Sequence, residues 1–275
     1  MEYWETVNRS GLYIAGYKNP PTNYFIAPAA EEFSELIKIW RQPAVKVVVL
    51  TGAVEERFIT HYSVEELVEM AKNPKLLNDA AHNLIYGYHT LMRSLAYLDK
   101  PIVVGMTGDT MGCGLELSLN CDIRVAQAGD YRIGFPEIAL GIMTGTGSQL
   151  LTRIIGHGRA LDFLLRSRTV NPKKALELGL VTEVAENAKE RAIKIAEGLM
   201  RQSSTSLAAA KRSLVRGGNL PIEEGLKIEA EEWLKTVVTT EALELMSDYI
   251  NQPFEKRGAW IDAHGVPPEL SDEYP

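Results

Sequence analysis

The sequence predicts an α/β fold with a largely parallel sheet, followed by a helical section towards the C-terminal end. Compact β-branched runs at residues 45–52 and 99–108 alternate with segments whose apolar residues recur at helical spacing. Strands that alternate with helices form βαβ units, in which the strands lie parallel. From residue 186 to about 250 nearly everything has helical periodicity. We expect a βα core over residues 1–200, a C-terminal helical section over 201–257 and a tail over 258–275.

Each element follows from a local pattern. Residues 11–17 alternate loosely, as a strand does, and a Pro/Asn-rich loop follows them. Residues 29–42 carry apolar side chains at helical spacing, and Ser63 and Glu66 have the spacing of a capping box at the start of another helix. The later expectations are a helix at 74–98, a glycine turn and helix at 110–122, a strand at 121–127, a glycine-rich loop and helix within 129–156, and a helix and short strand within 171–184. The Pro- and acid-rich tail should be loosely ordered.

Composition narrows the class of protein. The chain has 275 residues, is 45% hydrophobic and carries a formal net charge of −7 without a long Lys/Arg run. These values are typical of a globular protein and give no support for a nucleic-acid or membrane partner. Cys113 and Cys121 lie in one short segment, too far apart to bridge, which indicates reduced thiols and a cytoplasmic protein. No metal is expected, because no metal-ligand spacing occurs among His82, His89, His157 and His264.

Glu116 is a lone acid in an apolar helix that begins at a glycine-rich turn. Gly112 and Gly114 let the backbone approach a ligand, and the amides at a helix start, including that of Cys113, have no helical partner. A carboxylate one turn into such a helix would be poorly solvated, and its pKa could rise. The alternative is an ordinary first-turn acid that the helix dipole favours and that points to solvent.

A second acid, Glu137, follows Pro136 and precedes a series of glycines. The glycines at 141, 145 and 147 would leave room for a substrate. Taken alone, Glu137 could be an ordinary helix-start acid after proline. Two acids on consecutive βα units, each beside a glycine-rich turn, suit general acid/base chemistry on one small reacting group.

Four stretches resemble the crotonase, or enoyl-CoA hydratase/isomerase, superfamily. They read "KPIVVGMTGDTMGCGLELSLNCDIRVA", "FPEIALGIMTGTGSQLLTRIIG", "ALELGLVTEV" and "LAAAKRSL", and the resemblance extends over about residues 10–250. It implies a crotonase-like spiral of ββα units with a C-terminal helical section that covers the active site. It also implies a homotrimer or a dimer of trimers. This scaffold hosts many acyl-CoA chemistries, so the resemblance specifies the fold more closely than the reaction.

The resemblance implies a thioester oxygen held by the backbone N–H groups of Tyr62 and Cys113. Glu116 would activate water and Glu137 would protonate the α-carbon, as in an enoyl-CoA hydratase-type lyase acting on a 2,3-unsaturated acyl thioester. Coenzyme A would enter as part of the substrate, with no other cofactor. The expected substrate-binding residues are Lys18, Phe58, His61, Gly112, Gly141 and Gly145, with Lys211 or Lys256 as further positive charges.

One turn departs from the family pattern. "FITHYS" has His61, Tyr62 and Ser63 where the family usually has glycine, a small residue and aspartate. A backbone donor survives these changes, but the bulky side chains would alter the acyl pocket, and the glycine's positive φ would fall on His61. His61 or Tyr62 could then be an extra acid/base or recognition group, or His61 could bond locally while Tyr62 packs outward.

Other functions remain open at this point. Cys113 could act as a nucleophile, since thiols at helix N-termini can have a lowered pKa. Double-bond isomerisation, retro-aldol cleavage and thioester hydrolysis are alternative crotonase-type reactions. A non-catalytic acyl-CoA-binding protein is the alternative outside the enzymes.

Overall fold

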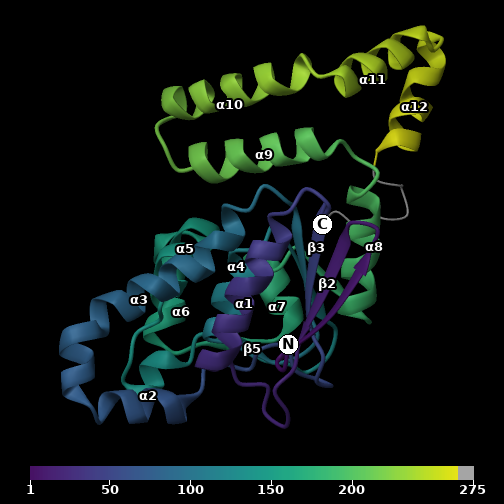
Figure 1. Cartoon of the computed structure of the whole chain (residues 1–275). Helices are drawn as coiled ribbons and strands as arrows, with labels where there is room; N and C mark the ends of the chain where they lie inside the picture. Colours follow the sequence, from purple (N-terminus) through teal and green to yellow (C-terminus); the bar gives the residue numbers. More distant parts are fainter. Residues whose placement is uncertain (266–275) are drawn as a thin grey trace.

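A six-stranded sheet with helices on both of its faces forms the body of the protein (Figure 1). The computed structural model describes residues 1–265, without the side chains of Pro74 and residues 76–82. The strand order is β1-β2-β3-β4-β6-β9; β1 and β2 pair antiparallel, and all other neighbours pair parallel. The strands are β1 (Trp4–Arg9), β2 (Leu12–Tyr17), β3 (Val47–Gly52), β4 (Ile102–Met106), β6 (Ile123–Gln127) and β9 (Glu183–Ala185).

A smaller sheet of three strands, in the order β5-β7-β8, gives the core its repeat. β4 and β6 lie in the large sheet, the strands that follow them, β5 and β7, lie in the small sheet, and helical turns follow each pair. This is a ββα repeat, and it confirms the predicted fold class. The elements are β5 (Thr110–Met111), α4 (Cys113–Leu119), β7 (Ile133–Gly134), η1 (Glu137–Leu140), α5 (Gly147–Ile155) and β8 (Thr169–Val170).

The large sheet is buried on both faces, which explains the continuous β-branched runs in its central strands. Side chains alternate between the two faces of a strand. Val47 and Val49 of β3 therefore pack in a cluster with α8 (Ala188–Leu199), whereas Val48 and Leu50 pack in a cluster with α1 (Ala27–Trp40) and α4. Figure 1 shows α1 and α8 on opposite sides of β2 and β3.

The remaining core helices agree with the sequence patterns. Ser63 caps α2, because its Oγ accepts the Glu66 amide at 3.2 Å. The core helices not yet given are α2 (Val64–Ala71), α3 (Pro74–Ala96), α6 (His157–Leu165) and α7 (Pro172–Leu178). Among the residues described, no helix is both long and apolar enough to cross a membrane.

Strand β1 was not expected from the sequence. Only Trp4 of its residues is buried, so the strand lacks the alternation that marks a half-buried strand. A two-residue turn joins it to β2, with Ser10 at φ 51° and Gly11 at φ 102°. Positive φ at both positions matches the twist of a tight hairpin. Pairing with β2 through this hairpin therefore forms a strand that the pattern of apolar residues did not indicate.

The C-terminal helices form an arm that is joined to the core through α9 (Figure 1). Its helices are α9 (Ser204–Gly217), α10 (Ile222–Val237), α11 (Thr240–Asn251), η2 (Phe254–Lys256) and α12 (Arg257–His264). Lys211 of α9 is buried, and its Nζ donates to Leu95 O, Lys100 O and Asp122 Oδ2. The tail, which was expected to be loosely ordered from residue 258, is helical up to His264, where α12 ends. Residues 266–275 lie outside the described part.

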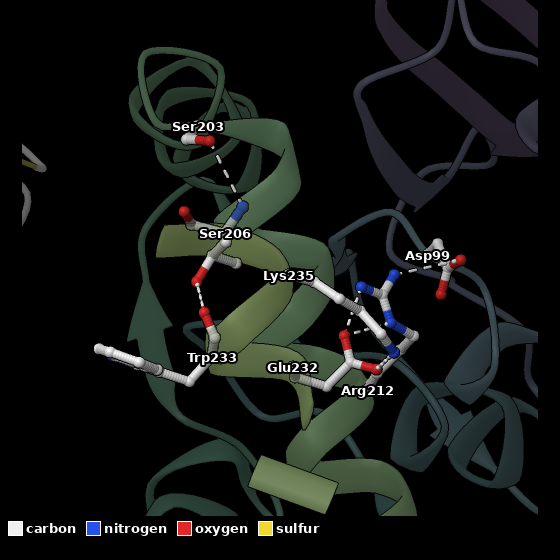
Figure 2. Close-up of polar contacts among 8 residues, drawn as sticks. Asp99, Ser203, Ser206, Arg212, Glu232, Trp233 and Lys235 are labelled. Carbon is white, nitrogen blue, oxygen red and sulfur yellow. Dashed lines mark hydrogen bonds and ion pairs between the residues drawn. The ribbon is translucent and has the colours of Figure 1, made fainter. Parts of the chain in front are cut away.

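A cluster of charges fastens α10 to α9. Glu232 is only 4% exposed, and its Oε2 accepts Arg212 NH2 at 2.6 Å while its Oε1 accepts Lys235 Nζ at 2.9 Å (Figure 2). Arg212 also reaches Asp99 at 3.3 Å. The hydrogen bonds from Arg212 and Lys235 hold the pKa of Glu232 at about 2.

A Glu232→Gln substitution tests this attachment. A carboxyl whose pKa is lowered by folding stabilises the fold above its ordinary value of 4.5, and this contribution is lost as the pH falls towards 2. The variant should melt about 3 °C below the parent at pH 7, and the difference should shrink between pH 4.5 and pH 2.5. Thermal unfolding followed by circular dichroism measures both values. Glu231→Gln, an exposed neighbour, is the matched control, and an equal effect in both variants would contradict the assignment.

Candidate active site

The N-terminus of α4 is packed tightly against the segment 59–61. A Cβ on Gly114 would lie 2.0 Å from the Ile59 carbonyl oxygen, so this approach requires glycine. Gly112 has φ 52°, and a Cβ there would lie 2.7 Å from Glu137 Oε1 and 3.4 Å from His61 Cβ. The glycines expected to admit a ligand thus also admit the Glu137 carboxyl to the start of the helix.

Two backbone amides beside this contact have no oxygen acceptor within the described residues. Phe25 N donates to His61 O, and Ser63 N donates to Phe25 O, both at 2.8 Å. Successive residues of an extended segment direct their amides to opposite edges, so the Tyr62 N–H faces away from Phe25. Over residues 1–265, the Tyr62 and Cys113 amides donate to no backbone or side-chain oxygen. Two such donors on adjoining segments provide what an oxyanion hole requires.

Glu116 is enclosed rather than directed to solvent. Glu116 is only 2% exposed, which contradicts the alternative of a solvent-facing first-turn acid and agrees with the expectation of a poorly solvated carboxylate. Oε1 accepts the amides of Thr146 at 2.6 Å and Gly147 at 2.7 Å, at the start of α5. Oε2 accepts the hydroxyl of Tyr88 at 2.5 Å. Three donors and a helix N-terminus replace the water that a buried carboxylate would otherwise need.

Glu137 has a different environment. Burial, with a smaller contribution from the negative charge of Glu116, raises the pKa of Glu137 to about 7. Its Oε2 is buried and has no hydrogen-bond partner in the described chain. The charges of both glutamates also raise the pKa values of Tyr88 and Cys113, after burial, which is the first cause for each. These four groups therefore share one electrostatic environment, and Glu137 can gain or lose a proton near neutral pH.

Cys113 is not an activated thiol. The side chain is buried, and burial raises its pKa well above the ordinary value, with the two glutamate charges adding to the effect. A thiol in this state remains protonated, so the alternative of a nucleophilic cysteine is not supported. Cys113 and Cys121 are both free and buried.

The atypical turn is held by local contacts. His61 Nδ1 bonds the Tyr62 carbonyl oxygen at 2.6 Å, and its ring stacks on Tyr24 at 4.1 Å. The Tyr62 hydroxyl donates to Glu66 Oε2 at 2.7 Å, and its ring packs against Phe25. These contacts favour the local interpretation of both side chains over an acid/base role.

The expected positive φ at His61 is wrong. The non-glycine residues with positive φ in the described chain do not include His61. The reason is the bridge between Phe25 and Tyr62, which keeps this segment extended. The turn therefore accommodates histidine without the strain that the sequence suggested.

Several expected substrate-binding residues have other roles. Phe58 is fully buried in the core, and its amide and carbonyl bond Asp109 O and the Asn23 side chain, so it cannot contact a substrate. Lys211 is buried and bonded within the chain, so it offers no charge to a ligand.

Three other residues that the sequence analysis assigned to substrate binding, Lys18, Gly141 and Lys256, are exposed. Lys18 forms an exposed ion pair with Glu5 at 2.7 Å, and Lys256 is exposed on η2. Gly141 has φ 74° and nothing within 4 Å of an added Cβ, so its backbone conformation rather than a close approach requires glycine.

Gly145 has a packing role that the sequence did not show. A Cβ there would lie 2.5 Å from the Tyr88 ring and 3.2 Å from Glu116 Oε2. The residue thus makes space for Tyr88 and Glu116 themselves. Tyr88 and the Thr146 and Gly147 amides are the site groups that the sequence analysis missed. No pattern in one sequence marks them, because their roles come from contacts between distant segments.

A cavity of about 460 Å³ lies at the other end of α4. It is bounded by α3, α5 and α9, and it touches Gly145 and Thr146 but not Glu137. Its charged groups are engaged within the protein: Arg93 bonds Asn120, Arg153 bonds Gln149, and Asp122 binds Lys211. The glutamate pair and the two amides, rather than this cavity, are therefore the candidate active site.

Known proteins resemble the chain over most of its length. The sequence pattern of the enoyl-CoA hydratase/isomerase family matches residues 9–259. A probable enoyl-CoA hydratase of Bacillus subtilis is 30% identical over 244 residues, covering 85% of this chain and 90% of its own. A 2,3-dehydroadipyl-CoA hydratase of Escherichia coli is 31% identical over 212 residues, covering 76% of this chain and 79% of its own. An enoyl-CoA hydratase structure from Bacillus anthracis superposes with a TM-score of 0.82 at 25% identity, covering 93% of this chain and 97% of that one.

The pH dependence of stability tests the environment of Glu137. A carboxyl whose pKa is raised to about 7 favours the folded state fully below its ordinary value of 4.5, and this contribution is lost as the pH rises through 7. Glu137→Gln removes that loss. Relative to the parent, the variant should therefore gain about 2 kcal/mol of stability between pH 5 and pH 8, allowing for partial exposure.

Urea unfolding at a series of pH values measures this gain. Glu186→Gln, which alters an exposed glutamate, should show the pH dependence of the parent. A parallel pH dependence for parent and Glu137→Gln would contradict the proposed burial of the Glu137 charge.

Proposed function

Because the chain belongs to the enoyl-CoA hydratase/isomerase family, we propose that it is an enoyl-CoA hydratase-type lyase. The reaction is the reversible addition of water to a 2,3-unsaturated acyl-CoA. The observation that carries the proposal is the contrast between the two acids: Glu116 is held by three donors, whereas Glu137 has a pKa of about 7 and a buried oxygen with no partner within the described residues. One base and one acid are what hydration needs.

The proposed steps assign each group a role. The Tyr62 and Cys113 amides bind the thioester oxygen and stabilise the enolate. Glu116 takes a proton from water as the water oxygen bonds to the β-carbon, and Glu137 gives its proton to the α-carbon. Glu116 ends protonated and Glu137 ends ionised, so exchange of one proton with solvent restores the starting state. Coenzyme A is part of the substrate, and no other cofactor takes part.

Substitution of either acid tests the mechanism. Glu116→Gln and Glu137→Gln should each lower kcat for hydration of crotonyl-CoA by about 10²- to 10⁴-fold, the usual contribution of a general acid or base. Product chromatography measures the 3-hydroxyacyl-CoA directly. Glu186→Gln is the matched control. Full activity in both site variants would eliminate the mechanism.

Double-bond isomerisation is the second candidate. The Tyr88 hydroxyl donates to Glu116 Oε2 and so occupies one hydrogen-bonding position of the oxygen that would bind water. The same two carboxyl groups could then move a proton between carbons of the acyl chain without adding water. Product analysis with 2-enoyl-CoA and 3-enoyl-CoA separates the two reactions. A non-catalytic protein is not favoured, because the Tyr62 side chain is bonded to Glu66 and packed on Phe25.

We propose further that the chain forms a homotrimer or a dimer of trimers. The arm beyond α9 presents large apolar side chains that are more than half exposed. They are Ile222, Leu226, Trp233, Leu234, Val238, Leu243, Ile250, Phe254 and Ile261. A monomer rarely exposes so much apolar surface on one segment. The buried free thiols are consistent with a reducing compartment such as the cytoplasm.

Light scattering after size-exclusion chromatography tests the assembly. The parent should elute at three or six times the chain mass of 30.5 kDa. Trp233→Glu together with Phe254→Glu should shift the assembly towards smaller species, because charges then replace apolar contacts. Glu231→Gln is the control. A monomeric parent at micromolar concentration would contradict the proposal.

A further inference from the structure

We propose that Tyr88 is a positioning residue for the base Glu116. This inference rests on the proposed function, because it assigns Glu116 the role of base. Tyr88 lies on α3, which is separated from α4 in the sequence, and its hydroxyl donates to Glu116 Oε2 at 2.5 Å. A hydrogen bond of this length to a carboxylate is charge-assisted and strongly directional.

The other oxygen of Glu116 is already committed. Oε1 accepts two amides, from Thr146 and Gly147, which fill the in-plane lone-pair positions that a carboxylate oxygen offers. Only Oε2 is left to take a proton from water. Because Tyr88 takes one position on Oε2, a single position remains, and Tyr88 therefore determines where the water is held.

The Tyr88 hydroxyl can act only as a donor to Glu116 at neutral pH. Burial raises the pKa of the phenol well above its ordinary value, and the charge of Glu116 raises it further. The phenol thus remains protonated, and its bond stabilises the ionised form of Glu116, which is the form that a base needs. A proton on Glu116 would compete with this bond.

The surroundings fix the position of the tyrosine ring. Gly145 lacks the Cβ that would lie 2.5 Å from the ring, so the ring fits against its backbone. The next residue of α3, His89, bonds the Gly145 carbonyl oxygen through Nε2 at 2.8 Å. Consecutive residues of one helix therefore contact the loop that also supplies the Thr146 amide. Rotation of Tyr88 away from Glu116 would have to break this arrangement.

Tyr88→Phe tests the role, because it removes the hydroxyl and keeps the ring. With crotonyl-CoA as substrate, kcat should fall about ten- to a hundred-fold, the usual value of a hydrogen bond to a charged group, while KM changes less than threefold. The acid limb of the kcat–pH profile should move to higher pH, which a merely structural role would not cause. Gly145→Ala, which displaces the ring, should move the profile in the same direction.

Tyr97→Phe is the matched control, and its kcat and pH profile should equal those of the parent. Tyr97 is exposed and directly follows α3. An unchanged kcat and pH profile in Tyr88→Phe would overturn the proposal. An increased hydration rate would also overturn it, because Tyr88 would then be excluding water rather than positioning the base.

A readout without turnover separates this inference from the proposed function. In protein labelled with ¹³C at tyrosine Cζ, the Tyr88 resonance can be assigned by its loss in Tyr88→Phe. This resonance should show that the Tyr88 phenol ionises at lower pH in Glu116→Gln than in the parent. The same ionisation in both would contradict the Tyr88–Glu116 contact. If the parent hydrates no enoyl-CoA but this shift is observed, the hydratase assignment fails while the contact holds.

Discussion

The Glu116 carboxylate, buried and held by three donors, is the interaction on which the geometry of the site depends. It joins α4 to the start of α5 through the Thr146 and Gly147 amides, and to α3 through Tyr88. Removing one partner of a buried charge leaves the other without its hydrogen bonds, at a cost of several kcal/mol. The base of the proposed reaction therefore also has a structural role, because its hydrogen bonds fix the positions of α3, α4 and α5 relative to one another.

The backbone character of the proposed oxyanion hole explains how an unusual turn is tolerated. His61 and Tyr62 replace small residues of the family pattern, but the donors are main-chain amides, which no side-chain replacement removes. The replacements instead acquired local partners, since Tyr62 binds Glu66 and His61 stacks on Tyr24. Glu66 also accepts the Ala27 amide at 3.0 Å, so these contacts tie the turn to the start of α1. The departure from the family pattern thus falls on a turn where the proposed chemistry uses main-chain amides.

The parallel βα core could be predicted from the sequence because its signals are local, such as the β-branched runs of β3 and β4. The ββα repeat and the pairing of Glu116 with Glu137 were implied by the resemblance to the crotonase superfamily, because each acid taken alone could have been an ordinary helix-start residue. The errors concern long-range effects. Phe58 is in the core because of what packs around it, and Lys211 is buried because α9 returns to residues near 95 and 122.

Tyr88 and the backbone at His61 show the same limitation within the site. The role of Tyr88 depends on Gly145, more than fifty residues away, and neither residue carries a recognisable motif. The φ angle at His61 is set by pairing with Phe25 and not by the residue that the family has at that position. One-dimensional patterns specify which elements form, whereas pairs of distant residues specify how the site is completed.

The two acids have different environments: Glu116 is matched with three donors, whereas burial, the larger cause, and the charge of Glu116 raise the pKa of Glu137 to about 7. Both lie in the same enclosed region, and each adds its charge to the shared environment of Tyr88 and Cys113. Glu116 accepts three hydrogen bonds, so its charge is compensated. Glu137 has a buried oxygen without a partner in the described structure, and its charge is opposed by that of Glu116. A negative charge on Glu116 thus favours a proton on Glu137, and the pair is prepared to remove one proton and deliver another in the same cycle.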